Sequence, residues 1–332
     1  MEVVFMEWQN KIILLTGGTG SFGQKFTEIM LKKYKPKVIR IFSRDELKQW
    51  EMEKKFSAYE EHLRFFIGDV RDKDRLERAM DGADIVVHAA ALKQVPLCEY
   101  NPFEAVKTNI LGAQNVIEAA IDHNIEKVIA ISTDKAVNPV NLYGATKMCM
   151  EKLFVSANSY VGGKRQTRMS CCRYGNVVGS RGSVIPLFKK QRLTGTITIT
   201  DRRMTRFWIT LEQGVEFVIR CLEMMHGGEI FVPKVPSMKI MDLAKVIAPD
   251  CKIKYIGIRP GEKIHECLLT EDEARHALEF EDFFVIEPEH PWWSREKWQD
   301  GKKLPEGFRY TSDTNKQWLT KEELKKMLKG LE

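Results

Sequence analysis

The chain has 332 residues, of which 43% are hydrophobic, enough for one large domain or two smaller ones around a sizeable core. Its net charge of +6 comes from Lys and Arg that alternate with acidic residues, so no basic stretch predicts nucleic-acid binding. No apolar run is long enough to cross a membrane, and the first residues do not resemble a signal peptide. The 7 cysteines lack CxxC pairs, which predicts reduced thiols without a metal site. We therefore expect a cytoplasmic protein that contacts neither membranes nor nucleic acids.

The first half of the chain alternates short apolar runs with longer amphipathic ones, the pattern of strand–helix units in a parallel sheet. Strands are expected at residues 11–16, 37–43, 63–68, 85–89 and 127–132. Helices are expected at residues 21–34, 45–57, 72–80, 102–124 and 142–159. The buried face of the last helix is expected to consist of Leu142, Ala145, Cys149, Leu153 and Val155. This order predicts an α/β fold with a Rossmann-type doubly wound parallel sheet.

The pattern becomes irregular from about Arg173, with short helices expected at residues 211–225 and 241–247. We interpret this part as a smaller α/β substrate-binding lobe beside the carboxyl edge of the sheet. The predicted division gives residues 1–175 and 207–233 to the Rossmann domain. Residues 176–206 and 234–332, including a Trp-rich tail, are assigned to the lobe.

A glycine-rich loop follows the first predicted strand and leads into the first predicted helix. Glycines let the backbone approach a pyrophosphate, and the helix N-terminus attracts its negative charge. Such a glycine triplet is weak on its own, but its place at the first strand–helix junction favours a dinucleotide site. The candidate residues are Gly17, Thr19, Gly20, Ser21, Phe22 and Gly23.

The end of the second predicted strand bears on the choice between NAD and NADP. NAD-selective sites carry an acidic residue there, whereas Ser43 and Arg44 suit the additional phosphate of NADP. Asp45 leaves NAD open, although it is equally suited to cap the following helix. Further candidates follow the third and fourth strands, where small or polar residues could contact the cofactor: Asp69, Val70, Ala89, Ala90 and Ala91.

Tyr143 and Lys147 are one helical turn apart, after the predicted strand that ends near Ser132 and Thr133. A tyrosine acts as a base at neutral pH only if positive charge lowers its pKa, and we expect Lys147 and the oxidised nicotinamide to do so. The hydroxyl of Thr133 could hold the substrate oxygen. This arrangement predicts removal of a hydroxyl proton while a hydride leaves the same carbon.

With these motifs, the chain resembles the extended short-chain dehydrogenases and, among them, the inverting UDP-N-acetylglucosamine 4,6-dehydratases. The resemblance covers roughly residues 10 to 287 and rests on residues 13–23, 43–48, 132–136, 141–147, 173–182, 204–208 and 259–263. It implies an NADP-dependent enzyme that forms homo-oligomers, dimers or hexamers, and takes part in pseudaminic acid biosynthesis. It also implies that Lys48 and Lys93 contact the cofactor.

The resemblance further implies catalytic roles for Asp134 and Lys135, which by residue type alone could be a solvated loop pair. Tyr143 would remove the 4-hydroxyl proton, Lys135 the proton on carbon 5, and Asp134 would protonate the departing 6-hydroxyl. Lysine can be a base only if its pKa is lowered, and we expect Lys147 to lower it. The implied ligands of UDP-N-acetylglucosamine are Lys93, Asn176, Val177, Arg181, Arg206, Arg259 and Glu262.

Two other functions remain open at this point. A nucleotide-sugar 4-epimerase would use Tyr143 and Lys147 but would not need Asp134 or Lys135. A non-catalytic NADP sensor would need only the Rossmann domain.

Overall fold

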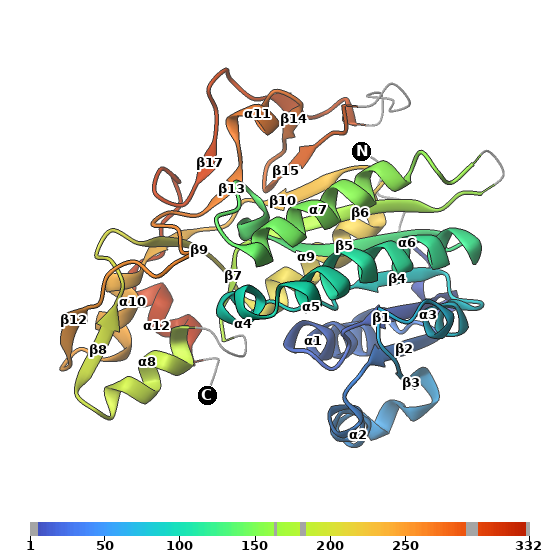
Figure 1. Ribbon diagram of the computed structural model, residues 1–332, viewed down its shortest axis with the longest axis horizontal. Coiled ribbons are helices and arrows are strands. Elements are labelled where there is room, and N and C mark those ends of the chain that lie inside the picture. Colours follow the sequence, from blue (N-terminus) through green and yellow to red (C-terminus); the bar gives the residue numbers. More distant parts are fainter. Residues whose placement is uncertain (1–5, 163–164, 180–183, 290–297, 330–332) are drawn as a thin grey trace.

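The computed structural model describes residues 6–162, 165–179, 184–289 and 298–329. Its largest element is a 10-stranded sheet with the order β16-β14-β15-β10-β6-β5-β4-β1-β2-β3 (Figure 1). The strands from β10 to β3 in this order pair in parallel, and β15, β14 and β16 extend the sheet in antiparallel pairs. The strands are β1 (Ile12–Thr16), β2 (Val38–Ser43), β3 (Leu63–Ile67), β4 (Ile85–His88), β5 (Lys127–Thr133), β6 (Arg168–Tyr174), β10 (Ile230–Pro233), β14 (Ala277–Glu279), β15 (Phe283–Ile286) and β16 (Lys302–Lys303).

Helices cover both faces of this sheet, which confirms the predicted Rossmann-type fold (Figure 1). On one face α3 contacts α6, which contacts α7, and on the other α1 contacts α9. The helices are α1 (Ser21–Ile29), α2 (Glu46–Lys55), α3 (Lys73–Met80), α4 (Val95–Tyr100), α5 (Pro102–Val106), α6 (Gly112–Asp122), α7 (Leu142–Ala157) and α9 (Leu211–Met224). Short 3-10 or π-helical turns are η1 (Trp8–Asn10), η2 (Met30–Tyr34), η3 (Ser57–His62), η4 (Lys107–Leu111) and η5 (Asp134–Ala136). None of the described helices is long and apolar enough to cross a membrane.

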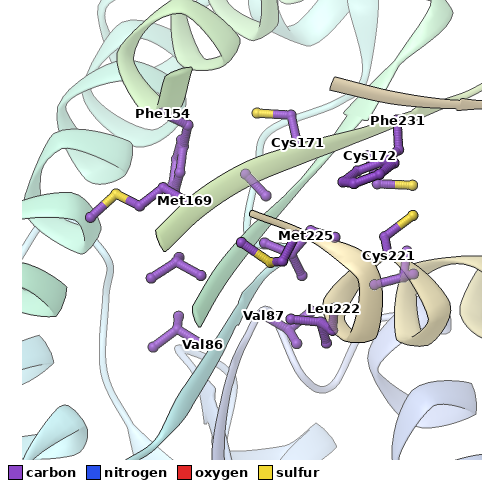
Figure 2. Packing of buried hydrophobic residues seen from close by; sticks show 14 of the residues in the cluster. Val86, Val87, Phe154, Met169, Cys171, Cys172, Cys221, Leu222, Met225 and Phe231 are labelled. Carbon is purple, nitrogen blue, oxygen red and sulfur yellow. The ribbon is translucent and has the colours of Figure 1, made fainter. Parts of the chain in front are cut away.

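The central strands are buried on both faces, which explains their continuous apolar runs. Figure 2 shows part of this core, with Phe154 of α7 on one side of β6 and Leu222 of α9 on the other. The cysteines are free thiols, and those that are fully buried belong to this interior or to the underside of α7: Cys98, Cys171, Cys172 and Cys221.

The five predicted strands agree with β1 to β5 to within one residue at each end. Strand β6 was not predicted, because buried polar residues such as Ser170 and Arg173 interrupt its apolar pattern. The helix expected at 21–34 consists of α1 and η2, and the one expected at 102–124 consists of α5, η4 and α6.

The predicted buried face of α7 was wrong. Leu142, Ala145, Cys149 and Leu153 are only partly buried, and Val155 alone of the predicted set is buried. The face that packs on the sheet instead carries polar residues among apolar ones, which are Tyr143, Gly144, Thr146, Lys147, Met150, Glu151, Phe154, Val155 and Ala157. Hydrophobic periodicity missed this face because several of its buried side chains are polar, among them Tyr143 and Lys147, which line the cavity described below.

A smaller lobe lies beside the carboxyl ends of the parallel strands (Figure 1). It contains β7 (Asn176–Val177), β9 (Thr205–Ile209) and β11 (Ser237–Lys239) in one sheet and β8 (Thr196–Ile199) and β12 (Lys252–Tyr255) in another. The helices α8 (Val184–Arg192), α10 (Ile240–Ile247) and α12 (Lys321–Lys329) surround a separate apolar cluster that includes Phe188, Trp208 and Leu243.

The C-terminal part is shared between the two regions. Strands β14, β15 and β16 extend the main sheet, although the sequence assigned residues 234–332 to the smaller lobe. Trp298 is buried against Phe231 and Phe280 of the main core. Strand β13 (Cys267–Leu269) is followed by α11 (Glu271–Ala274), which leads to β14. Strand β17 (Tyr310–Thr311) comes later in the chain and pairs with β13, and α12 then returns to the smaller lobe. The tail therefore connects both parts of the molecule.

Candidate active site

A cavity of about 1400 Å³ lies between the carboxyl edge of the main sheet and the smaller lobe. Its lining includes most of the residues selected from the sequence, which are Gly17, Thr19, Gly20, Ser21, Phe22, Ser43, Arg44, Asp45, Lys48, Asp69, Val70, Ala89, Ala90, Ala91, Lys93, Thr133, Lys135, Tyr143, Lys147, Asn176, Val177, Arg206, Arg259 and Glu262. Gly23 and Asp134 do not line it, and Arg181 lies outside the described residues. The described residues contain no cluster of His, Cys, Asp and Glu that could hold a metal ion.

The loop between β1 and α1 brings backbone close to the cavity. Gly17 has a φ of +67°, and a Cβ atom there would lie 2.8 Å from the backbone nitrogen of Ala90. At Gly23 a Cβ atom would lie 2.2 Å from the carbonyl oxygen of Gly18. Gly23 therefore allows α1 to pack against the loop rather than contacting a ligand. No described side chain caps the start of α1, so its first N–H groups are available to an anion.

The residues after β2 form a small polar group at one end of the cavity. The carboxylate of Asp45 accepts a hydrogen bond from the backbone of Lys48 at 3.0 Å and also pairs with the Lys48 ammonium group. Hydrogen bonds from Lys48 lower the pKa of Asp45. Asp45 thus caps α2, one of the two roles that the sequence left open. Arg44 lies 3.5 Å from Asp69, and Thr19 donates to the hydroxyl of Ser43 at 3.1 Å.

Tyr143 and Lys147 lie on the buried face of α7, beneath the cavity. The Lys147 ammonium group donates to the Ile131 carbonyl at 2.7 Å, and burial lowers its pKa to about 8. Burial raises the pKa of Tyr143 to about 12, and the positive charge that chiefly opposes this rise is that of Lys135. The sequence-based expectation named Lys147 and the oxidised nicotinamide as the sources of this charge, and it overlooked Lys135.

Asp134 and Lys135 form a hydrogen-bonded pair at the end of β5. The fully buried Asp134 accepts from Thr133 at 2.9 Å and from the Lys135 ammonium group at 3.0 Å through the same oxygen, Oδ1. Its second oxygen, Oδ2, has no hydrogen-bond partner among the described residues. Burial raises the pKa of Asp134, and the negative charge of Glu266 adds to the rise.

The pKa of Lys135 moves opposite to the sequence-based expectation. Burial by itself would lower it, but the carboxylates of Asp134 and Glu266 raise it above its usual value. The Lys135 ammonium group lies 3.0 Å from Asp134 and 3.6 Å from Glu266, so the lowering of its pKa that we expected from Lys147 does not occur. The chain thus holds a protonated lysine against a carboxyl group that resists ionisation.

The smaller lobe contributes the remaining predicted residues. Arg206 donates to the backbone carbonyls of Thr205, Ile264 and Lys263 at 2.7 to 3.0 Å. Arg259 pairs with Glu262 at 3.4 Å, and both residues line the cavity. The sequence placed Asn176 with the substrate ligands, and its side-chain oxygen in fact also accepts from Lys135 at 3.4 Å. Burial lowers the pKa of Lys93, and the charge of Lys135 lowers it further.

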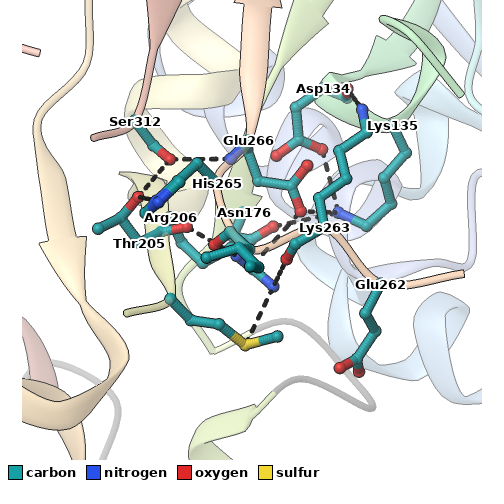
Figure 3. Close-up of polar contacts among 12 residues, drawn as sticks. Asp134, Lys135, Asn176, Thr205, Arg206, Glu262, Lys263, His265, Glu266 and Ser312 are labelled. Atoms are coloured by element: carbon teal, nitrogen blue, oxygen red, sulfur yellow. Dashed lines mark hydrogen bonds and ion pairs between the residues drawn. The ribbon is translucent and has the colours of Figure 1, made fainter. Parts of the chain in front are cut away.

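Among the cavity residues that were not selected from the sequence, Glu266 and Lys263 contact the Asp134–Lys135 pair. Glu266 lies 3.6 Å from Lys135 and 3.4 Å from Arg206, and Lys263 donates to the carbonyl of Asp134 at 3.4 Å (Figure 3). Lys263 ends the stretch 259–263 on which the resemblance rests, and Glu266 follows it, but only the folded chain brings them beside residues of η5 and β9.

Comparison with known proteins identifies the family. Residues 13–288 match the model of the family described as polysaccharide biosynthesis protein. The inverting UDP-N-acetylglucosamine 4,6-dehydratase of Campylobacter jejuni subsp. jejuni serotype O:23/36 (strain 81-176) is 54% identical over 96% of this chain and 97% of that protein. The UDP-glucose 4-epimerase of Rickettsia conorii is 46% identical over 83% of each chain. The X-ray structure of Pen from Bacillus thuringiensis is 41% identical, with a TM-score of 0.88 over 98% of this chain and 100% of that one. This chain therefore belongs to the polysaccharide biosynthesis protein family, among the relatives of the inverting UDP-N-acetylglucosamine 4,6-dehydratases.

Proposed function

We propose that this protein is an NADP-dependent, inverting UDP-N-acetylglucosamine 4,6-dehydratase. The observation that carries the proposal is that Lys135, which lines the cavity with Tyr143, donates a hydrogen bond to the fully buried Asp134 at 3.0 Å. An oxidoreductase that only moves a hydride needs the tyrosine, whereas loss of water also needs one group to remove a proton from carbon 5 and another to protonate the leaving hydroxyl. The similarity to the Campylobacter dehydratase supports the same assignment.

Several cavity residues support the proposal of a nicotinamide dinucleotide with an additional phosphate. Gly17 leaves space that a side chain would fill, and the uncapped start of α1 suits the pyrophosphate. Arg44 and Lys48 supply positive charge at the end of β2, where Asp45 is already occupied as a helix cap. When bound, the cofactor supplies the hydride acceptor for carbon 4 and the hydride donor for carbon 6.

Three side chains move protons in the proposed reaction. Tyr143 removes the proton of the 4-hydroxyl group; because burial raises its pKa to about 12, its ionised form needs the positive charge of the oxidised nicotinamide in addition to that of Lys135. The ketone formed at carbon 4 acidifies carbon 5, from which neutral Lys135 removes a proton. Protonated Asp134 gives its proton to the 6-hydroxyl group, which leaves as water. Carbon 6 then receives the returned hydride and carbon 5 a solvent-derived proton from the opposite face, which gives the 4-keto-6-deoxy sugar of L-arabino configuration.

The Asp134–Lys135 hydrogen bond explains how a lysine with a raised pKa can act as a base. Moving one proton across the 3.0 Å contact converts an ammonium and a carboxylate into an amine and a carboxylic acid. The total charge of the pair is unchanged, and burial favours the neutral form of both groups. A single proton shift therefore prepares the base and the acid together.

The predicted substrate ligands divide by their surroundings. Arg259 and Glu262 both line the cavity, and in this proposal the two-pronged donor Arg259 binds the diphosphate while Glu262 accepts a hydrogen bond from a sugar hydroxyl. Asn176 and Lys93 lie near Lys135, which supports their assignment to the hexose. Arg206 has donors engaged with backbone carbonyls, so we assign it to shaping this part of the cavity as well as binding.

A 4-epimerase is the second candidate, favoured by the Rickettsia relative. The test is to incubate the purified protein with UDP-N-acetylglucosamine and NADP and to identify the product by NMR. We expect a 4-keto-6-deoxy sugar from the natural protein and none from Lys135→Met. A 4-epimer that retains its 6-hydroxyl, formed equally well by Lys135→Met, would establish the epimerase instead. Binding of NADP without any turnover would indicate a sensor.

We also propose that the protein forms homo-oligomers through α4, α5 and η4. These elements expose apolar side chains on one continuous stretch of chain, with Tyr100 86% and Phe103 77% accessible, beside Leu97 and Leu111. Light scattering should give a mass of at least two chains, and Phe103→Asp should lower it. A monomeric natural protein would refute this assignment.

A further inference from the structure

Glu266 is a buried carboxylate at the centre of the polar contacts in Figure 3. Its side chain is only 3% exposed, and one oxygen, Oε1, lies 3.6 Å from the Lys135 ammonium nitrogen and 3.4 Å from Nε of Arg206. The second oxygen, Oε2, has no hydrogen-bond partner among the described residues. The Lys135 ammonium group thus lies within 4 Å of two carboxylates, that of Asp134 at 3.0 Å and that of Glu266 at 3.6 Å.

The C-terminal segment fixes the backbone of Glu266. Its N–H group donates to the hydroxyl of Ser312 at 2.9 Å, and the N–H group of Ser312 donates to the Glu266 carbonyl at 2.8 Å. Ser312 is fully buried and shares a hydrogen bond of 2.7 Å with the hydroxyl of Thr205. The carboxylate therefore projects from a rigid point where the tail meets the smaller lobe.

Lys135 depends on Glu266 more than Arg206 does. Arg206 keeps its hydrogen bonds to three backbone carbonyls whether or not Glu266 is present. Among the described residues, the Lys135 ammonium group otherwise contacts only side chains, Asp134 at 3.0 Å and Asn176 at 3.4 Å. Loss of the Glu266 charge should consequently displace the lysine rather than the arginine.

We propose that Glu266 is a positioning residue that holds the Lys135 ammonium group beside Asp134, so that these two side chains exchange one proton in the pH range of the reaction. This inference rests on the proposed function. It adds a third ionisable side chain, from a distant part of the chain, to the pair that removes water.

The charges around Glu266 determine the expected pH dependence. Facing it are Lys135 and Asp134 from η5, Arg206 from β9 and Lys263 from its own loop. The charges of Lys135 and Asp134 also act on Tyr143 of α7, and His265 precedes Glu266 in the chain. The Glu266 charge raises the pKa values of both Asp134 and Lys135. Because the reactive pair carries one proton, removing this charge should move both limbs of the pH profile to lower pH.

The test is Glu266→Gln, which keeps the shape of the side chain and removes its charge. We expect kcat to fall about 100-fold, the effect of a misplaced reacting group, with KM changed less than about threefold. The pH optimum should move down by about one unit. Calorimetric binding of UDP-N-acetylglucosamine should remain close to that of the natural protein, which also shows that the variant is folded.

Glu262→Gln is the matched control, because Glu262 lies in the same loop and lines the same cavity but pairs with Arg259. It should raise KM and leave the pH optimum in place. Unchanged kcat and pH optimum in Glu266→Gln, or a raised KM with unchanged kcat, would overturn the proposal. If Glu266→Gln does not fold, Glu266→Asp replaces it: one methylene shorter, it should lower kcat at constant KM, and an unchanged kcat refutes the role. Failure of the natural protein to form a 4-keto product would instead refute the proposed function.

Discussion

Arg173 provides the most direct test of how the site is held together. Its guanidinium group donates to Glu151 of α7 at 2.7 and 2.9 Å, to Glu273 of α11 at 2.9 and 3.1 Å, and to the Leu268 carbonyl at 3.0 Å. Arg173 and Glu151 are both 2% exposed. Replacing Arg173 by Met leaves the Glu151 carboxylate buried without its partner. Breaking a buried pair in this way costs about 3 to 5 kcal/mol, a large fraction of the roughly 5 to 15 kcal/mol that stabilises a typical protein.

Urea unfolding followed by circular dichroism measures this cost as a lower midpoint at unchanged slope. The double variant Arg173→Met/Glu151→Met is the control, because it removes the stranded carboxylate as well. Glu273 is 22% exposed and can be solvated when Arg173 is lost. We expect the double variant to recover at least half of the lost free energy. A loss below about 1 kcal/mol in the single variant, or a double variant that is no better, would refute the reasoning.

Three further predictions concern the cofactor loop, the cofactor phosphate and pH. Gly23→Ala should weaken NADP binding about tenfold or more in a fluorescence titration, because the added methyl group must displace the Gly18 carbonyl and a cost of about 1.4 kcal/mol lowers affinity tenfold. Normal affinity in this variant would contradict the close contact. Arg44→Ala should weaken NADP binding about 10- to 100-fold and NAD binding little, and equal losses would argue against a phosphate contact. Burial lowers the pKa of His88 to about 3, so between about pH 6.5 and pH 3 the unfolded chain binds a proton that the folded chain does not. Stability should therefore fall with decreasing pH by up to about 1.4 kcal/mol per unit, and less steeply in His88→Gln, as measured by urea unfolding at pH 7 and pH 5.

The sequence predicted the parts of the fold that depend on local pattern. Strands such as β1 and β4 are buried on both faces, so their apolar runs are unmistakable, and the glycine loop is recognisable from its place between β1 and α1. The buried face of α7 was not predictable in this way, because it carries the charged residues Lys147, which donates to the Ile131 carbonyl, and Glu151, which pairs with Arg173. Strands β14 to β16 were missed because short antiparallel strands lack a strong signal.

The site was predictable only as far as its residues are close in sequence. Tyr143 and Lys147 are one helical turn apart, and Asp134 and Lys135 are adjacent. The direction of the Lys135 pKa shift was not predictable, because it depends on Glu266, which another part of the fold brings to it. Gly23 was predicted as a ligand contact from its motif, whereas the packing of α1 on Gly18 explains its presence.

The central claim is that this site oxidises carbon 4, removes water across carbons 5 and 6, and inverts carbon 5. NMR of the product formed from UDP-N-acetylglucosamine in deuterated water tests all three at once. We predict a 4-keto-6-deoxy sugar with deuterium on carbon 5 and the L-arabino configuration. Retained configuration at carbon 5 would contradict inversion, and a 4-keto product with no deuterium there would contradict the elimination.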